Sequence, residues 1–364
     1  WAAIEIMDVA VASNASDFFS SSNSAPAIRI TASSNNGVAF ESGAYANAAN
    51  LINIQASGSG GVTISGTNGS TTLNRPEVGI NGTNLLSAGP ITINTASVTA
   101  GVGGFFDSAL YNGGSSGISN IGYCVVATCP LSQVTTTTAS ITFNINRQAS
   151  YFSPVNNNIN TKGTVTFMPS LATGFLSQVP TGNDKISSDC TGLYIGKDQS
   201  TNNWAYSSTN AYSIAGPIQI YAGTANITSN MTSTGASGGI LVKATGDITV
   251  SGGVSGTPRT LQTNASPLTL WSNSDATGTG AIYLDQYSAL NSAGGAITAT
   301  ATGGAITLAG GADTNSDGIP DGNAFAPATA GVPGISLGRS FNTALAHSAL
   351  TNLASSIKIY AGTS

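Results

Sequence analysis

The sequence predicts an all-β fold, a parallel β-solenoid (β-helix) of short strands with irregular insertions. Short apolar–polar–apolar triplets recur along the 364 residues, and Gly, Asn, Ser or Thr flank nearly all of them. Hydrophobic residues make up 40% of the chain, enough for a core, although only 7% of the residues are charged. A β-sandwich or jelly roll is the second choice, because strands in those folds also recur every ~8–12 residues.

Each triplet is predicted to be a strand, because alternate residues of a strand point to opposite faces. Two apolar residues then face the core and one polar residue faces outward. The triplets of the first half are Ile28-Arg29-Ile30, Ile52-Asn53-Ile54, Val62-Thr63-Ile64, Ile91-Thr92-Ile93 and Val165-Thr166-Phe167. Those of the second half are Ile218-Gln219-Ile220, Ile248-Thr249-Val250, Leu268-Thr269-Leu270, Ile282-Tyr283-Leu284, Ile306-Thr307-Leu308, Ile335-Ser336-Leu337 and Ile357-Lys358-Ile359.

The triplets follow one another at two spacings. The longer spacing is 20–24 residues, as from 28 to 52, 141 to 165, 218 to 240, 248 to 268 and 335 to 357. The shorter spacing is 8–10 residues, as from 52 to 62 and 240 to 248. Together they predict a coil whose turns each hold two or three strands. Turns stacked ~4.8 Å apart satisfy each other's backbone groups and close the core.

The chain divides into three predicted sections. Residues 1–100 and 211–364 carry most of the triplets and are predicted to be β-solenoid. Residues 101–210 are rich in insertions: they contain long stretches without triplets, several aromatic residues and all three cysteines. Solenoids carry binding features on such insertions. The middle section is therefore interpreted either as a projecting recognition element or as a decorated part of the same coil.

Two smaller features complete the structural predictions. Cys124, Cys129 and Cys190 suit one disulfide plus one spare thiol, with three buried reduced cysteines as the alternative. A short helix is predicted over 340–354, where apolar residues follow Ser340 at a spacing of four. These apolar residues are Phe341, Leu345, Ala349 and Leu353.

The most specific chemical motif lies at 313–321, with the sequence Asp-Thr-Asn-Ser-Asp-Gly-Ile-Pro-Asp. Oxygen ligands alternate along it, the sixth residue is a glycine that permits a sharp turn, and an acid stands ninth, a pattern that suits Ca²⁺. The predicted ligands are the side chains of Asp313, Asn315, Asp317 and Asp321 and the carbonyl of Ile319. The stretch resembles the calcium loops of thrombospondin type 3 repeats and dockerins. It carries Ala324 where those loops place a bidentate Glu, so a weaker site, or a solvated turn, is expected.

Several segments resemble the repeats of bacterial filamentous-haemagglutinin-like exoproteins. They are Gly60-Gly61-Val62-Thr63-Ile64-Ser65-Gly66, Gly246-Asp247-Ile248-Thr249-Val250-Ser251-Gly252-Gly253 and Gly304-Ala305-Ile306-Thr307-Leu308-Ala309-Gly310-Gly311. The resemblance covers about half of the chain and is strongest over 50–100 and 215–310. It implies a secreted right-handed β-helix that acts as an adhesin or a surface fibre.

Composition disfavours several classes of function. Lys and Arg total 10 against 15 acidic residues, with no basic cluster, so nucleic acid is not an expected partner. No apolar run reaches the ~18 residues of a membrane helix, so no membrane insertion is expected. There is one His, and no cluster of acids is visible outside 313–321, so no enzyme is predicted. The first residue is Trp1 rather than Met, which predicts a processed or excised segment.

The sequence therefore predicts a non-enzymatic, extracellular structural protein, the subunit of a cell-surface fibre or surface layer. Neither end shows a cap, and Ile218-Gln219-Ile220-Tyr221-Ala222-Gly223-Thr224 returns as Ile357-Lys358-Ile359-Tyr360-Ala361-Gly362-Thr363. Self-association through the solenoid ends is expected, since uncovered edge strands can pair with another chain. The alternative is an adhesin segment that binds host or surface glycans through 101–210. A β-helical polysaccharide-active enzyme is a lesser alternative.

Overall fold

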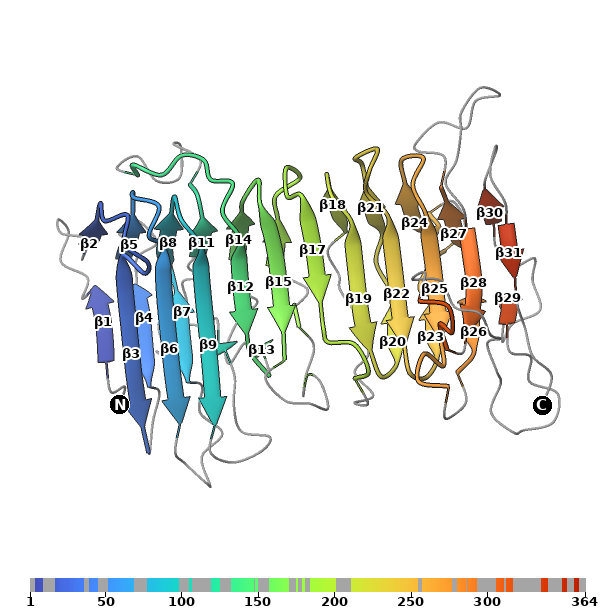
Figure 1. Ribbon diagram of the computed structural model, residues 1–364, viewed down its shortest axis with the longest axis horizontal. Coiled ribbons are helices and arrows are strands. Elements are labelled where there is room, and N and C mark those ends of the chain that lie inside the picture. Colours follow the sequence, from blue (N-terminus) through green and yellow to red (C-terminus); the bar gives the residue numbers. More distant parts are fainter. Residues whose placement is uncertain are drawn as a thin grey trace. The chain divides into compact units, whose positions relative to one another are not determined.

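The computed structural model describes 22 stretches of the chain: residues 4–8, 17–35, 39–44, 52–68, 77–97, 105–106, 119–124, 132–146, 148–149, 157–169, 175, 179–180, 184–200, 211–254, 257–276, 280–285, 287–292, 306–310, 312–316, 335–339, 349–351 and 357–359. Within them all regular structure is β, in short strands that pair in parallel (Figure 1). The chain forms two compact units, Trp1–Leu171 with Phe175–Cys190, and Ala172–Gly174 with Thr191–Ser364.

In the first unit, successive strands visit three sheets in rotation, so that the chain returns to the same sheet every third strand. The first sheet contains, in spatial order, β1 (Ile4–Asp8), β4 (Phe40–Ala44), β7 (Val78–Asn81), β10 (Phe105–Phe106) and β13 (Gln148–Ala149). The second contains β2 (Asp17–Ser20), β5 (Ile52–Ala56), β8 (Thr83–Ser87), β11 (Ser119–Gly122), β14 (Asn157–Asn160) and β16 (Asp184–Ile186). The third contains β3 (Ile28–Ser34), β6 (Val62–Asn68), β9 (Ile91–Ser97), β12 (Ile141–Asn144) and β15 (Thr164–Met168).

The second unit has the same three-sheet rotation. One sheet contains β17 (Gly192–Ile195), β19 (Ile218–Ala222), β22 (Ile240–Ala244), β25 (Leu268–Ser272), β28 (Ile306–Gly310) and β31 (Ile357–Ile359). Another contains β18 (Tyr212–Ile214), β21 (Met231–Ser233), β24 (Arg259–Thr263), β27 (Ser288–Asn291) and β30 (Ala349–Thr351). The last contains β20 (Ala225–Ile227), β23 (Ile248–Val250), β26 (Ile282–Asp285) and β29 (Ile335–Arg339).

The all-β prediction is confirmed, and the long parallel sheets are consistent with a β-helix. Parallel pairing does not fit the sandwich or jelly roll, because those folds are built from antiparallel strands. The core is a set of columns in which equivalent residues of successive strands stack. Ile54, Leu85, Ile121 and Ile159 form one such column, and each side chain is at most 1% exposed.

The predicted spacing between turns is right in places and wrong in others. Ile218 does pair with Ile240, and Ile141 with Val165. Ile28, however, pairs with Val62 rather than Ile52. Turns in fact range from 22 residues (218 to 240) to 51 residues (306 to 357). The 20–24 residue spacing had mixed strands of different sheets, because loops of unequal length separate strands that are equivalent in register.

The helix predicted over 340–354 is wrong for the part that the structure describes. Ala349–Thr351 is strand β30, which pairs with β27 and places Leu350 in register with the buried Leu290. A spacing of four residues is an even number, so it also puts side chains on one face of a strand. Pairing with β27 therefore decides the conformation.

Polar residues on the outside of the first unit also stack in register. The side-chain amide nitrogen of Asn84 donates to Oδ1 of Asn53 at 2.8 Å, Asn120 donates to Asn84 at 2.8 Å, and Asn158 donates to Asn120 at 3.0 Å. We call these four residues the asparagine ladder. Each amide finds its partner one strand away, so the ladder stabilises the stacking of strands that are far apart in sequence.

Candidate functional site

The predicted calcium loop lies partly within the described residues. Asp313 is half-buried, Asn315 is exposed, and Ser316 has a left-handed backbone with φ of 60°. The other predicted ligands, Asp317, Ile319 and Asp321, lie outside the described residues. Within the described part of the chain, no three His, Cys, Asp or Glu side chains gather as metal ligands would. The described half of the loop nevertheless carries two side-chain oxygen donors in the expected alternation, which fits a hard cation.

The middle section, 101–210, supplies the strands β10 to β17 and so contributes to the sheets of both units. Cys124 is disulfide-bonded, and Cys190 is a buried thiol outside any disulfide. One disulfide plus one spare thiol is therefore confirmed; Cys129 lies outside the described residues. Cys124 packs with Val134 on Leu86 of β8, so the chain that follows β11 covers part of the outside of its own sheet.

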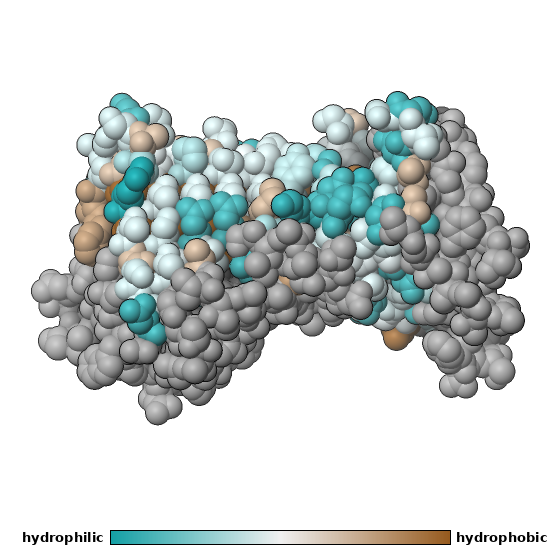
Figure 2. Space-filling view, turned by 60° about the horizontal axis from the view of Figure 1, so that its bottom comes forward, coloured by the Kyte–Doolittle hydropathy of each residue, from teal (hydrophilic) through white to brown (hydrophobic). Residues whose placement is uncertain are grey.

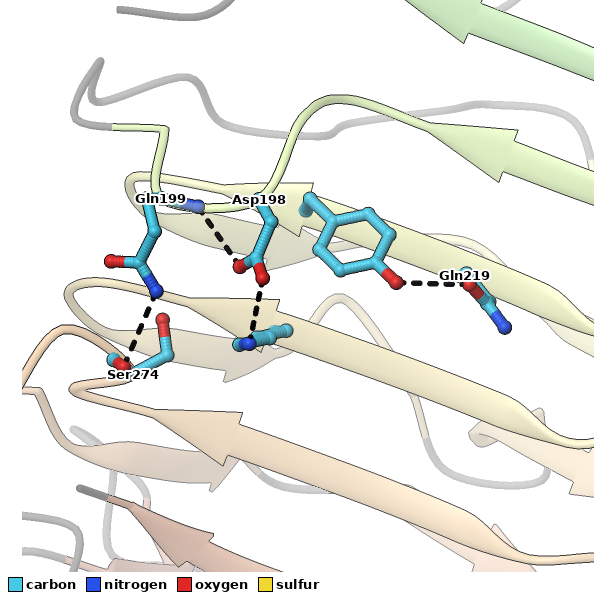
Figure 3. Close-up of polar contacts among 6 residues, drawn as sticks. Asp198, Gln199, Gln219 and Ser274 are labelled. Atoms are coloured by element: carbon cyan, nitrogen blue, oxygen red, sulfur yellow. Dashed lines mark hydrogen bonds and ion pairs between the residues drawn. The ribbon is translucent and has the colours of Figure 1, made fainter. Parts of the chain in front are cut away.

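A cluster of aromatic and polar side chains lies on the outside of β17, β19, β22 and β25 in the second unit (Figure 3). The register places Tyr221, Lys243 and Trp271 one after another on neighbouring strands. Gly196, with φ of 90°, ends β17 where an added Cβ would meet the carbonyl oxygen of Tyr221. This close approach turns the chain so that Asp198 lies over the same face.

The charged groups of this cluster pair with one another. The Lys243 ammonium lies 2.9 Å from Oδ2 of Asp198 and 4.0 Å from the ring centre of Trp271. The Tyr221 hydroxyl donates to Oε1 of Gln219 at 2.9 Å. Burial raises the pKa of Tyr221, and the negative charge of Asp198 raises it further. The cluster therefore presents a nearly neutral, aromatic surface at neutral pH, and it also holds the loop after β17 against the sheet.

A second feature is the first turn, β1 to β3, whose strands lie at the edges of their sheets. Ile28 and Ile30 are half-buried, whereas their register partners Val62 and Ile64 are 1% and 0% exposed. Phe18 is 46% exposed, although its partner Ile54 is fully buried. Within the described residues, the core columns are therefore uncovered at this end. Figure 2 shows apolar residues at the left edge of the molecule, on the side where Figure 1 places β2 and β3.

Sequence reasoning missed both features. Asp198, Gln219, Lys243 and Trp271 are scattered over the sequence, and only the register brings them together. The uncovered first turn was detectable in part, because a strand around Ile4-Glu5-Ile6 without a preceding cap was predicted, and β1 occupies that position. The exposure of Phe18 had no signal, since Asp17-Phe18-Phe19-Ser20 does not form an alternating triplet.

The described residues contain no helix that could span a membrane. Comparison with protein-family models, with characterised proteins and with solved structures found no significant match. Proposals about function therefore depend on the geometry described above.

Proposed function

We propose that this chain is a non-enzymatic, extracellular structural protein with a β-solenoid fold, a subunit of a cell-surface fibre or surface layer that assembles through its ends. The observation that carries the proposal is the uncovered first turn. Edge strands present N–H and C=O groups that can pair with another chain, and here the half-buried Ile28 and Ile30 and the exposed Phe18 add an apolar surface beside them. Low charge leaves little repulsion between copies. The Cys124 disulfide supports an oxidising, extracellular compartment.

Sedimentation velocity and negative-stain electron microscopy of the full chain test this proposal. We expect filaments or larger species that grow with protein concentration. Phe18→Asp should suppress them, because a carboxylate at the uncovered core column would be desolvated on association. Val254→Asp is the matched control, since Val254 is 59% exposed but lies outside the edge strands. A chain that stays monomeric at high concentration, with or without Ca²⁺, contradicts the proposal.

We also propose that Ca²⁺ binds the 313–321 loop and stabilises the second unit. At a concentration a hundredfold above its Kd, a bound ion would add about 2.7 kcal/mol to the free energy of unfolding. Thermal melting with Ca²⁺ or with a chelator should show a higher Tm in Ca²⁺. Asp317→Ala should abolish that difference. An equal shift in the variant, or no shift in the wild type, would show that the loop is a solvated turn.

Glycan adhesion is the second candidate, and the aromatic cluster of the second unit favours it. Sugar rings stack their C–H faces on aromatic rings and hydrogen-bond to amides and carboxylates. Tyr194, Tyr221 and Gln219 are half-buried, and the Asp198 side chain is 50% exposed, so all four are accessible from solvent. A glycan array should detect binding that Tyr221→Ala weakens and Thr307→Ala leaves unchanged. The array should replace a deletion of 101–210, which would remove core strands β10 to β17. Binding that does not respond to Tyr221→Ala excludes this face.

A further inference from the structure

The first and last turns of the chain match strand by strand. In the first turn, Ile4 is in register with Phe40, Phe18 with Ile54, and Ile28 with Val62. In the last described turn, Ile335 is in register with Ile282, Leu350 with Leu290, and Ile357 with Ile306. The residues Phe40, Ile54, Val62, Ile282 and Leu290 are at most 1% exposed. Each turn therefore places one apolar residue per sheet at the end of a buried column.

Exposure at the two ends is also similar. Ile335 is half-buried, while Ile282, one strand further in, is fully buried. Ile28 at the other end has the same relation to Val62, which is 1% exposed. Within the described residues, β29, β30 and β31 are the outermost strands of their sheets at one end, as β1, β2 and β3 are at the other. Both ends thus combine an edge strand with an incompletely covered core column.

We propose that the last turn of one copy pairs with the first turn of a second copy, head to tail and in parallel register. Strand β29 then pairs with β1, β30 with β2, and β31 with β3. This specifies the partner surface of the end-to-end assembly proposed above and rests on that proposal. The contact continues each column with an apolar residue: Ile335 leads to Ile4, Leu350 to Phe18, and Ile357 to Ile28. It also continues the parallel pairing found inside each unit.

A head-to-head contact fits less well. Two first turns related by a two-fold axis would pair β3 with β3 in antiparallel orientation, because a two-fold axis reverses the strand direction. Every pairing between named strands of the described sheets is parallel, and the twist and register of such sheets suit another parallel strand. The head-to-tail contact also uses both uncovered ends, whereas the two-fold contact leaves the last turn unpaired.

Charge makes the head-to-tail contact sensitive to salt. Arg29, between Ile28 and Ile30, is exposed. Lys358 occupies the same register position of β31, between Ile357 and Ile359. In the proposed contact these two cations stand directly opposite each other, and like charges in register destabilise a strand pair. Salt screens that repulsion, with a Debye length of ~10 Å at 0.1 M. Assembly is therefore weak at low ionic strength and is promoted by salt.

A charge-reversal series on the full chain tests the contact by sedimentation at low and high salt. Arg29→Glu and Lys358→Glu each convert the repulsive pair into an attractive one, so each should tighten association on the order of tenfold at low salt. Each should also reverse the salt dependence. The double variant restores a like-charge pair and should return to weak, salt-promoted assembly. Lys162→Glu is the control for net charge, because Lys162 is exposed and lies between β14 and β15.

The possible outcomes separate the two proposals. Assembly that responds to Arg29→Glu but not to Lys358→Glu overturns the head-to-tail contact in favour of a head-to-head one. Assembly that responds to neither variant, or to Lys162→Glu equally, overturns it as well and leaves the fibre proposal standing. If the wild type and all variants are monomeric at every salt concentration, both proposals fail.

Discussion

Ile248→Asp is expected to unfold the second unit, or to lower its free energy of unfolding by several kcal/mol. Ile248 is fully buried in β23 and is in register with Ala225 and Ile282, both also fully buried. An aspartate at this position would place a charge in an apolar column that offers it no counter-charge. Such a group either remains charged at a high desolvation cost or takes up a proton, and both outcomes favour the unfolded chain.

Thr249→Asp is the matched control, because Thr249 follows Ile248 on the same strand and is half-buried on the opposite face. It should change the free energy of unfolding by no more than about 1 kcal/mol, as is usual for surface substitutions. Urea unfolding followed by circular dichroism measures both variants. Equal losses at the two positions would show that the register of β23 is wrong.

Phe143→Ala is expected to destabilise the first unit by about 3–5 kcal/mol, the usual cost of truncating a buried Phe. The rings of Phe143 and Phe167 stack with their centres 4.6 Å apart and an angle of 5° between their planes. They are 1% and 0% exposed, on the adjacent strands β12 and β15. Removing one ring leaves a cavity and takes the stacking partner from the other.

The control for this prediction is Thr142→Ala, which shortens a half-buried residue beside Phe143. Its effect on urea unfolding should stay within about 1 kcal/mol. Phe143→Leu should fall between the two, because it retains part of the buried volume. A loss under 1 kcal/mol for Phe143→Ala would mean that the two rings do not stack in the core.

Strand positions could be predicted from the sequence because the information is local. An alternation such as Ile218-Gln219-Ile220 fixes which residues face the core, and Ile218 and Ile220 are indeed fully buried. Strand partners could not be predicted, because they depend on loops whose lengths the triplets do not report. Ile91, for example, pairs with Ile141 across an insertion, whereas Ile141 pairs with Val165 after a shorter loop.

The same limit applies to the candidate sites. The calcium loop is contiguous in sequence, so its ligand pattern could be recognised directly. The pairing of Lys243 with Asp198 and Trp271 depends on a register between strands separated by long loops, and no local pattern encodes it. The helix prediction at 340–354 failed for a related reason: local spacing was used where pairing with β27 determines the conformation.

The asparagine ladder gives the first unit an electrical direction. All three amide hydrogen bonds point the same way, from Asn158 towards Asn53, so their dipoles add as peptide dipoles do along a helix. Asp17 is in register with Asn53, at the donor end of the row, and the exposed Lys185 is in register with Asn158, at the acceptor end. An acid and a base thus stand at the ends that their charges complement. The row behaves as a capped dipole, and a further turn extends it favourably in only one orientation.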